Sequence, residues 1–238
     1  MRARVERIGD VTVLPVMAAP VEYRQQLQAR IRPLMTGIGP VEGAIALTAE
    51  LARREATGDM PDLVVVLGSS GSPTLEHAAV YQVTSVDYRD MDASPLGFPK
   101  GITPLLDMPA VMPLPCRLEG VPHATLSTGA NVVSGAAYDA LDADMVDMET
   151  FALLRSAQTF CVPLMALRGV SDGKAELTRL EDWTSTLDHV DANLADAWDK
   201  LVAALERGGL HALMPATLEQ PAANGLDPAA TPVSDSLS

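Results

Sequence analysis

The sequence predicts an α/β fold in which apolar strands alternate with amphipathic helices. Residues 63–67 form an unbroken aliphatic run, which is typical of a strand covered on both faces. Residues 144–147, 148–160 and 163–170 follow one another as strand, helix and strand, which predicts a βαβ unit of parallel strands. Small or acidic residues follow the predicted strands. Since the carboxyl ends of parallel strands share one edge of a sheet, we expect a ligand site at that edge.

Further elements are expected along the first half of the chain. Residues 11–17 form a short apolar run that predicts a strand, and Pro20 fits the first turn of a helix over residues 21–30. A second helix should follow Thr36-Gly37-Ile38-Gly39. Its apolar face is predicted from the residues that recur at helical spacing: Val41, Ala44, Ile45, Thr48, Leu51 and Ala52.

The second half is expected to continue this pattern around an irregular middle. Strands are predicted over residues 80–86 and 124–127. The Pro-rich residues 104–122 should form an excursion at the surface. A long amphipathic helix that begins near Leu187 should end at Gly208-Gly209.

The composition fits one globular domain followed by a tail. With 238 residues, 47% of them hydrophobic, the chain can bury a large core without a metal or disulfides. We expect the α/β domain over residues 1–213 and a disordered tail, rich in Pro, Ala and Ser, over residues 214–238. The formal net charge of −14 argues against a nucleic acid partner, because phosphate binding depends on clustered Lys and Arg.

We expect no metal, no cofactor and no membrane span. Glu6, Asp10 and Pro15 interrupt the apolar stretch near the amino terminus, and no apolar run approaches the length of a membrane span. The four histidines are scattered without metal-ligand spacing. Cys116 and Cys161 each lie in apolar surroundings, which indicates buried, reduced thiols and a cytoplasmic location.

Two acids stand at equivalent points of the predicted βαβ unit. Glu149 follows its first strand and Asp172 follows its second, so both should face one cleft. Pairs of carboxyl groups of this kind cleave glycosidic bonds. Each acid also has a simpler interpretation, because Ser-Asp-Gly suits a turn and a carboxylate at a helix start is favoured by the helix dipole.

In their order along the chain, several motifs resemble the nucleoside phosphorylase and nucleosidase superfamily, and most closely its 5′-methylthioadenosine/S-adenosylhomocysteine nucleosidases. The likeness spans roughly residues 11–207. The motifs are Thr36-Gly37-Ile38-Gly39, Gly68-Ser69-Ser70-Gly71, Tyr88-Arg89-Asp90-Met91-Asp92-Ala93, Val146-Asp147-Met148-Glu149 and Arg168-Gly169-Val170-Ser171-Asp172-Gly173. The resemblance implies a nucleoside phosphorylase-like, three-layer α/β/α domain around a mixed, partly closed central sheet. It also implies a homodimer that takes a small nucleoside and hydrolyses the bond between adenine and ribose.

The resemblance assigns roles to individual residues. Asp172 matches the acid that protonates adenine as it leaves, and Ser171 would orient it. Glu149 matches the carboxylate that binds both ribose hydroxyls and stabilises the developing positive charge. Three further substrate contacts are expected. Met148 matches the residue that lies along the sugar face, and Ser70 and Gly71 match the residues that line the pocket wall. Val132 matches the residue whose backbone contacts the base.

Two departures from the family pattern affect the expected chemistry. In the most direct alignment, Pro20 occupies the position of the glutamate that activates the attacking water. Glu22 lies two residues later and is the candidate substitute, although it would also be favourable simply as a charge at a helix start. Asn131 stands where many members carry an aromatic residue that stacks on adenine.

Two alternatives to a nucleosidase remain open. A phosphorylase of the same superfamily would carry an arginine two residues before the Gly-Ser/Thr-x-Gly loop, but Val66 holds that position, which favours hydrolysis. A nucleoside-binding relative with weakened catalysis would result if Pro20 leaves the site without its base. Trp183 is expected to pack in the core rather than to cap the 5′ substituent.

Overall fold

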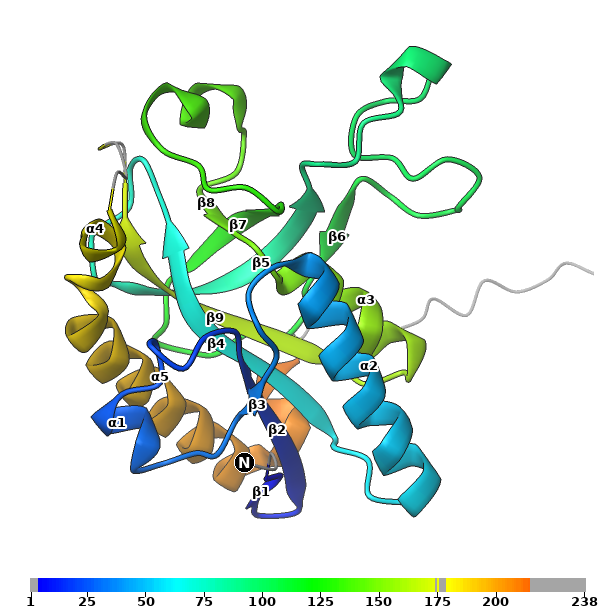
Figure 1. Ribbon diagram of the computed structural model, residues 1–238. Coiled ribbons are helices and arrows are strands. Elements are labelled where there is room, and N and C mark those ends of the chain that lie inside the picture. Colours follow the sequence, from blue (N-terminus) through cyan, green and yellow to red (C-terminus); the bar gives the residue numbers. More distant parts are fainter. Residues whose placement is uncertain (1–3, 174, 176–178, 215–238) are drawn as a thin grey trace, which may run out of the picture.

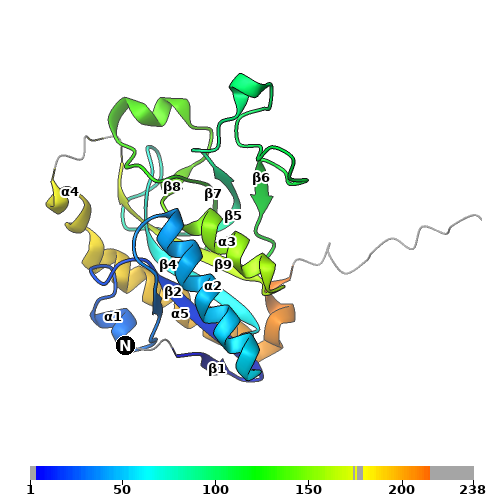
Figure 2. The ribbon, with the colours of Figure 1, turned by 45° about the vertical axis from the view of Figure 1, so that its right-hand side comes forward.

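The computed structural model describes residues 4–173, 175 and 179–214, which form one three-layer α/β/α domain (Figure 1). Helices α1 (Gln25–Gln28) and α5 (Leu187–Gly208) cover one face of the sheet, and α2 (Pro40–Thr57) and α3 (Thr150–Thr159) cover the other, as the turned view confirms (Figure 2). The short helices are α4 (Leu180–Thr184) and the 3₁₀ helices η1 (Ser94–Leu96), η2 (Gly135–Ala140) and η3 (Gly209–Leu213). The three-layer fold is therefore confirmed.

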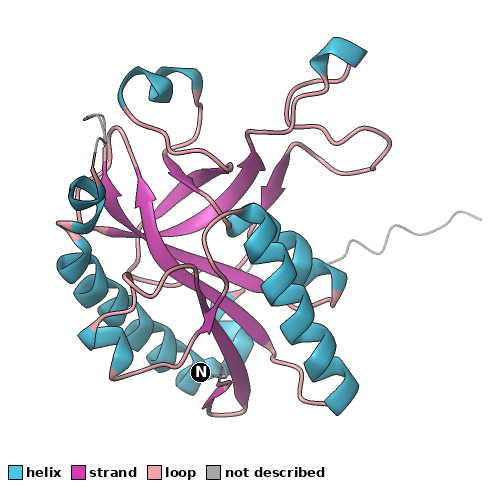
Figure 3. Cartoon of the chain, viewed as in Figure 1, coloured by secondary structure: helices cyan, strands magenta, loops and turns pink. Residues whose placement is uncertain are grey.

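The strands of the described residues form a single nine-stranded sheet. They are β1 (Glu6–Ile8), β2 (Val11–Met17), β3 (Leu34–Met35), β4 (Leu63–Gly71), β5 (Val80–Tyr88), β6 (Val111–Pro113), β7 (His123–Thr128), β8 (Met145–Asp147) and β9 (Leu164–Asp172). The loops over residues 89–110 and 129–144 project from the sheet on the side away from the amino terminus (Figure 3).

The aliphatic run in β4 serves two hydrophobic cores. Leu63, Val65 and Leu67 pack in the core under α5, whereas Val64 and Val66 pack in the core under α2 and α3. Successive side chains of a strand point to opposite faces, so a strand with a helix layer on each face must be apolar at every position. This confirms the interpretation of residues 63–67.

The sheet closes on itself over part of its width. Strand β4 pairs with β8, which is followed by β7 and β5, and β9 pairs with both β5 and β4. These strands form a closed ring, while β2 and β1 extend from β4 as an open wing. Both parallel and antiparallel pairs occur in the ring, so the expected mixed, partly closed sheet is confirmed.

The predicted βαβ unit of parallel strands is wrong. Strand β8 pairs with β4 in antiparallel orientation, whereas β9 pairs with β4 in parallel orientation, and β8 and β9 do not pair with each other. The two strands still meet at one residue of β4, because Gly71 pairs with Val146 on one side and with Asp172 on the other. Closure of the ring therefore brings the two strand ends together, in place of the expected crossover.

The predicted helix over residues 21–30 is mostly a turn. Hydrogen bonds from the amides of Glu22 and Tyr23 to the carbonyls of Ala19 and Pro20 turn the chain, and α1 covers only Gln25–Gln28. A carboxylate from a distant helix replaces the missing helical contacts. Asp191 of α5 accepts hydrogen bonds from the backbone amides of Arg24 at 3.2 Å, Gln26 at 2.7 Å and Leu27 at 3.2 Å.

Helix α2 buries a different face from the one predicted. Its buried residues are Gly43, Leu47, Leu51 and Arg54. Arg54 is buried because Glu50 and Asp59 both accept hydrogen bonds from its guanidinium. Two residues expected on the buried face, Val41 and Ile45, are instead 65% and 60% exposed. The apolar stripe of α2 thus faces away from the core of this chain.

Several other sequence predictions have different outcomes. Cys116 is buried as expected, but Cys161 is exposed, because it follows the last turn of α3 at the surface. The tail was predicted over residues 214–238, and all of it after Met214 lies outside the described residues. No helix within residues 4–173 and 179–214 is long and apolar enough to cross a membrane.

We expect Asp191→Ala to lower the free energy of unfolding by about 2–4 kcal/mol, because it leaves the buried amide of Leu27 and the partly buried amides of Arg24 and Gln26 without their acceptor. Urea unfolding followed by circular dichroism measures the change. Asp188→Ala is the matched control. Its carboxylate bonds Arg24 from a side chain that is 81% exposed, so the loss should stay below about 1 kcal/mol. Equal losses in the two variants would contradict the proposed role of Asp191.

Candidate active site

A cavity of about 560 Å³ opens at the end of the sheet where β4, β8 and β9 meet. The carboxylates of Glu22, Glu149 and Asp172 all line it. Its other lining residues come from the segments after β2 and β3, from β4, from the loops after β5 and β7, from β8 and the residue after it, and from α4 and the residue before it: Ala18, Ala19, Ile38, Ser69, Ser70, Gly71, Arg89, Asn131, Val132, Val133, Val146, Asp147, Met148, Arg179 and Trp183. The three predicted acids therefore share one site.

Glu149 stands at the start of α3, directly after β8. Its Oε1 accepts a hydrogen bond of 2.9 Å from the amide of Gly39. Gly39 has a φ of 105°, a conformation that disfavours other residues, and it directs this amide at the carboxylate just before α2 begins. Burial, with the nearby charge of Asp147, raises the pKa of Glu149 from 4.5 to about 7, although Arg168 and the Gly39 amide act in the opposite direction.

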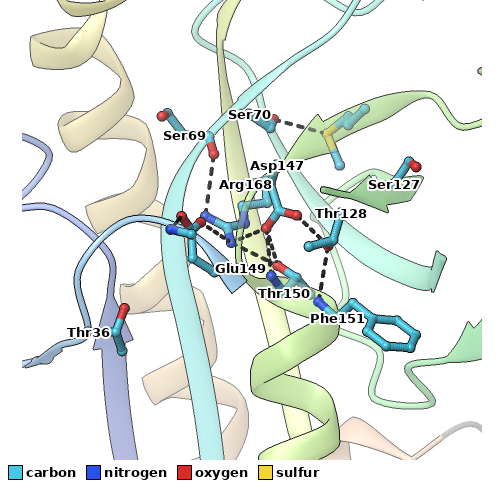
Figure 4. A network of polar contacts seen from close by, with 12 residues as sticks. Thr36, Ser69, Ser70, Ser127, Thr128, Asp147, Glu149, Thr150, Phe151 and Arg168 are labelled. Atoms are coloured by element: carbon cyan, nitrogen blue, oxygen red, sulfur yellow. Dashed lines mark hydrogen bonds and ion pairs between the residues drawn. The ribbon is translucent and has the colours of Figure 1, made fainter. Parts of the chain in front are cut away.

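A buried ion pair lies behind Glu149 (Figure 4). The guanidinium of Arg168 bonds Asp147 and donates to the hydroxyl of Thr150 at 2.8 Å, and its Nη2 lies 3.7 Å from Glu149 Oε2. Asp147 also accepts from the amide of Thr150 at 2.9 Å and from the hydroxyl of Thr128 at 2.5 Å. Sequence reasoning assigned no role to Asp147 or to Arg168, although both lie within its motifs.

Asp172 ends β9 on the opposite side of Gly71. Ser171 donates a hydrogen bond of 2.6 Å to Asp172 Oδ1, which is the contact expected of an orienting residue. Burial raises the pKa of Asp172 above its usual value, while the Ser171 hydrogen bond and the charge of His77 act in the opposite direction. Asp172 is therefore protonated over a wider pH range than an exposed aspartate.

The site needs glycine at position 71. A side-chain carbon on Gly71 would lie 2.2 Å from the hydroxyl of Tyr138 and 2.7 Å from Asp172 Oδ2. Both distances are far below van der Waals contact. The absence of a side chain on Gly71 thus leaves room for the buried hydroxyl of Tyr138, from η2, beside the carboxylate of Asp172.

Glu22 enters the cavity from the turn after β2. Its Oε1 accepts hydrogen bonds from the amide of Ser69 at 2.7 Å and from the hydroxyl of Ser69 at 2.6 Å. Within the described part of the chain, the buried Oε2 has no hydrogen-bond partner. Pro20 is exposed and is not among the residues that line the cavity. The turn, which replaces the predicted helix start, places the carboxylate of Glu22 rather than residue 20 in the site.

The predicted substrate-binding residues fall into two groups. Gly71, Met148 and Val132 line the cavity, and Val132 is 64% exposed. Ser70 also lines it, but its buried hydroxyl contacts the sulfur of Met145 at 3.4 Å. Ser171 is not among the lining residues, and its hydroxyl contacts Asp172 Oδ1 and, at 3.3 Å, the carbonyl of Ser70.

Arg89 was missed as a structural residue of the site. Its guanidinium donates to the backbone carbonyls of Ser127 at 2.6 Å, Asp147 at 3.0 Å, Gly129 at 3.2 Å and Asn131 at 2.7 Å. It therefore fastens the loop after β7, which carries Asn131 into the cavity wall. No sequence signal indicates this role, because all these acceptors are main-chain oxygens apart from Asn131 Oδ1, which lies 3.4 Å from Arg89 Nε.

Trp183 lines the cavity and is only half-buried, so the expectation that it packs in the core is wrong. Among the described residues, no cluster of three or more His, Cys, Asp and Glu side chains could hold a metal ion. The charged groups of the cavity are thus carboxylates and arginines.

Comparison with known proteins agrees with this geometry. The family model described as Phosphorylase superfamily matches residues 23–203. A 5′-methylthioadenosine/S-adenosylhomocysteine nucleosidase from Baumannia cicadellinicola is 28% identical over 159 residues. That alignment covers 58% of this chain and 66% of the length of the relative.

Solved structures share the fold at lower identity. A 5′-methylthioadenosine/S-adenosylhomocysteine nucleosidase from Colwellia psychrerythraea, in complex with adenine, superposes with a TM-score of 0.66 at 17% identity, over 82% of this chain and 96% of that one. Futalosine hydrolase from Helicobacter pylori superposes with a TM-score of 0.65 at 17% identity, over 80% of this chain and 97% of that one.

We expect Glu149→Gln to flatten the dependence of stability on pH. Because the pKa of Glu149 is about 7 in the folded protein and 4.5 in the unfolded chain, the folded chain holds the proton more strongly. Stability should therefore fall as the pH rises from about 4.5 to 7 in the parent, and fall less in the variant. Urea unfolding at several pH values measures this. The exposed Glu55→Gln should follow the parent, and parallel curves for parent and Glu149→Gln would contradict the prediction.

Proposed function

The chain belongs to the phosphorylase superfamily, and we propose that it hydrolyses the N-glycosidic bond of nucleosides of the 5′-methylthioadenosine or S-adenosylhomocysteine type, with release of adenine. The observation that carries this proposal is the convergence of Glu22, Glu149 and Asp172 on one cavity. The cavity volume of about 560 Å³ lies within the range of small-molecule sites. The nucleosidase from Baumannia cicadellinicola supports the type of substrate.

Asp172 is proposed as the general acid. Adenine is a poor leaving group as an anion, and protonation of its ring nitrogen as the bond breaks removes that obstacle. The raised pKa of Asp172 favours the protonated form that this step needs. The hydrogen bond from Ser171 holds Oδ1 and orients the carboxyl group at the cavity wall.

Glu149 is proposed to bind the ribose and to stabilise the transition state. The sugar acquires positive charge as adenine departs, and an ionised carboxylate close to that charge lowers the barrier. The Gly39 amide holds Glu149 Oε1, and this amide and Arg168 limit the rise that burial causes, so that the pKa of Glu149 is about 7 and the ionised form is present at neutral pH. Met148, the neighbouring residue, lines the cavity where it would contact the sugar.

Glu22 is proposed as the base that activates the attacking water. Its Oε1 is held by two donors of Ser69, and its Oε2 has no partner among the described residues. Such an oxygen can accept a hydrogen bond from water and take its proton. The position of Glu22 in the cavity supports hydrolysis over a nucleoside-binding relative, which is the alternative that Pro20 raises.

Water rather than phosphate is proposed as the acceptor. Phosphate binding in this superfamily is expected to use an arginine at the position of Val66, and Val66 is buried in the core beneath α2 and α3. Its side chain is not among those that line the cavity. Hydrolysis therefore fits this position better than phosphorolysis does.

We also propose that the chain acts as a homodimer in the cytoplasm. The apolar side chains of Val41 and Ile45, with Ile38 at 51% exposure, form a surface beside the cavity that a second copy could cover. The cysteines Cys116 and Cys161 are both free thiols, as is usual for proteins in a reducing compartment.

The direct test is incubation of the pure protein with 5′-methylthioadenosine, S-adenosylhomocysteine or futalosine in phosphate-free buffer. We expect chromatography to show free adenine from the first two nucleosides, at a rate that added phosphate leaves unchanged. Asp172→Asn should lower this rate by about two to four powers of ten, because the amide cannot donate the same proton. The exposed Asp139→Asn is the control and should keep the parent rate. Ribose 1-phosphate as a product would reassign the protein to the phosphorylases, and activity on futalosine alone would change the substrate.

We expect Glu22→Gln to lower turnover by roughly 10²- to 10⁴-fold, because an amide cannot act as a base. Pro20→Glu should leave turnover unchanged, because the exposed position 20 lies outside the cavity wall. Steady-state kinetics with methylthioadenosine compares both variants with the parent. Full activity of Glu22→Gln, or a large gain from Pro20→Glu, would show that Glu22 is not the base.

A further inference from the structure

Trp183 makes a polar contact that sequence reasoning did not anticipate. It lies on α4, lines the cavity and places its indole Nε1 2.9 Å from the hydroxyl oxygen of Ser69. The two residues are 114 positions apart in the chain. Ser69 is the residue whose amide and hydroxyl both bond Glu22. The wall of the cavity is therefore connected to the proposed base through one serine.

The chemistry of the donors fixes the direction of this chain of hydrogen bonds. An indole nitrogen can only donate, so Trp183 donates to Ser69 Oγ. The single hydroxyl hydrogen of Ser69 is then left for Glu22 Oε1, 2.6 Å away. If Ser69 rotated its hydrogen elsewhere, the carboxylate would lose a donor. The indole thus favours the one orientation of Ser69 that supports Glu22.

The main chain supports the same arrangement. The amide of Ser69 donates to Glu22 Oε1, and the carbonyl of Ser69 accepts from Arg168 Nη1 at 3.3 Å. A side-chain carbon on the preceding residue, Gly68, would lie 2.6 Å from Arg168 Nη1 and 3.4 Å from both oxygens of Glu22. The carboxylate of Glu22 and the guanidinium of Arg168 therefore both lie over Gly68, where β4 has no side chain. In this space, Oε1 of Glu22 is saturated and Oε2 is the oxygen left for substrate water.

We propose that Trp183 is a positioning residue for the reaction, which acts through Ser69 to hold Glu22 with Oε2 available as the base. This inference rests on the proposed function, since it assigns a helper to the proposed base. Helix α4 is itself anchored beside the acid, because Thr186, just after its end, donates to the carbonyl of Ser171 at 2.8 Å. Residues 183–186 thus contact both Ser69, which bonds Glu22, and Ser171, which bonds Asp172.

The test is a double-mutant cycle on Trp183 and Ser69. Trp183→Phe keeps an aromatic ring and removes only the indole N–H and part of the ring area. We expect it to lower kcat about 3- to 10-fold with KM changed less than about twofold, which corresponds to one hydrogen bond. In a Ser69→Ala background the same substitution should have little further effect, because the group through which it acts is gone.

The chain offers a matched control, since its only other tryptophan, Trp198, lies on α5, is buried in the core and does not line the cavity. Trp198→Phe should leave kcat close to that of the parent, and circular dichroism checks that all variants fold. The inference is overturned if Trp183→Phe matches Trp198→Phe in kcat. It is equally overturned if Trp183→Phe has the same effect in the parent and in the Ser69→Ala background.

A measurement without turnover separates this inference from the proposed function. In the Trp198→Phe background, Trp183 is the only tryptophan, and its fluorescence emission should move to shorter wavelength when Ser69→Ala removes the acceptor of its N–H. An unchanged emission spectrum would overturn the inference. Failure of the parent to release adenine while the emission still shifts would instead refute the proposed function and leave the contact between Trp183 and Ser69 established.

Discussion

The buried ion pair of Arg168 and Asp147 is the interaction on which the rest of the site depends. Arg168 is 1% exposed, and an isolated charge in such a place would be strongly unfavourable. The pair is tolerated because Asp147 is also bonded by Thr128 and Thr150. Removal of either partner would leave an uncompensated charge in the centre of the closed ring, which is generally far more costly than the pair itself.

This ion pair also orders the acids of the cavity. It joins β9, which carries Arg168, to β8, which carries Asp147, and the hydrogen bonds of Asp147 to Thr150 fix the first turn of α3. Glu149 lies between these two residues along the chain and so has little freedom. The Oε1 of Glu149 accepts a hydrogen bond from the Gly39 amide, and its Oε2 lies 3.7 Å from the guanidinium of Arg168.

Glycines in the strands and loops around the cavity make room for the polar groups. A side-chain carbon on Gly68 would collide with Arg168, and one on Gly129 would collide with Arg89. A side-chain carbon on Gly71 would collide with Tyr138 and Asp172. Gly68 and Gly129 thus admit the long side chains of Arg168 and Arg89, which bond main-chain or carboxylate oxygens, and Gly71 leaves room for Tyr138 beside Asp172. The carboxyl groups of Glu149 and Asp172 are also buried away from water, and this burial raises the pKa values of both. We interpret the burial of these two acids as a cost in folding stability that makes the acids more reactive.

The sequence by itself determined the layers, most of the strands and the acids at the ends of β8 and β9, because these depend on local patterns. Continuous apolar runs and strand-end motifs are readable without knowledge of distant contacts. Three features of the site depend on the tertiary structure alone, and the first is the way in which the two acids come together. Closure of the ring at Gly71, rather than a parallel crossover, brings Glu149 and Asp172 together.

The other two features also rest on contacts between distant segments. The chain after β2 forms a turn at residues 19–23, followed by amides that Asp191 of α5 bonds, and this turn rather than the alignment of Pro20 places Glu22 in the cavity. The long reach of Arg89 and Trp183 to acceptors on other strands is invisible in the sequence, since backbone carbonyls and a serine hydroxyl have no motif. Local patterns specify elements, whereas the partners of a polar side chain depend on which elements the closed sheet brings within a few ångströms.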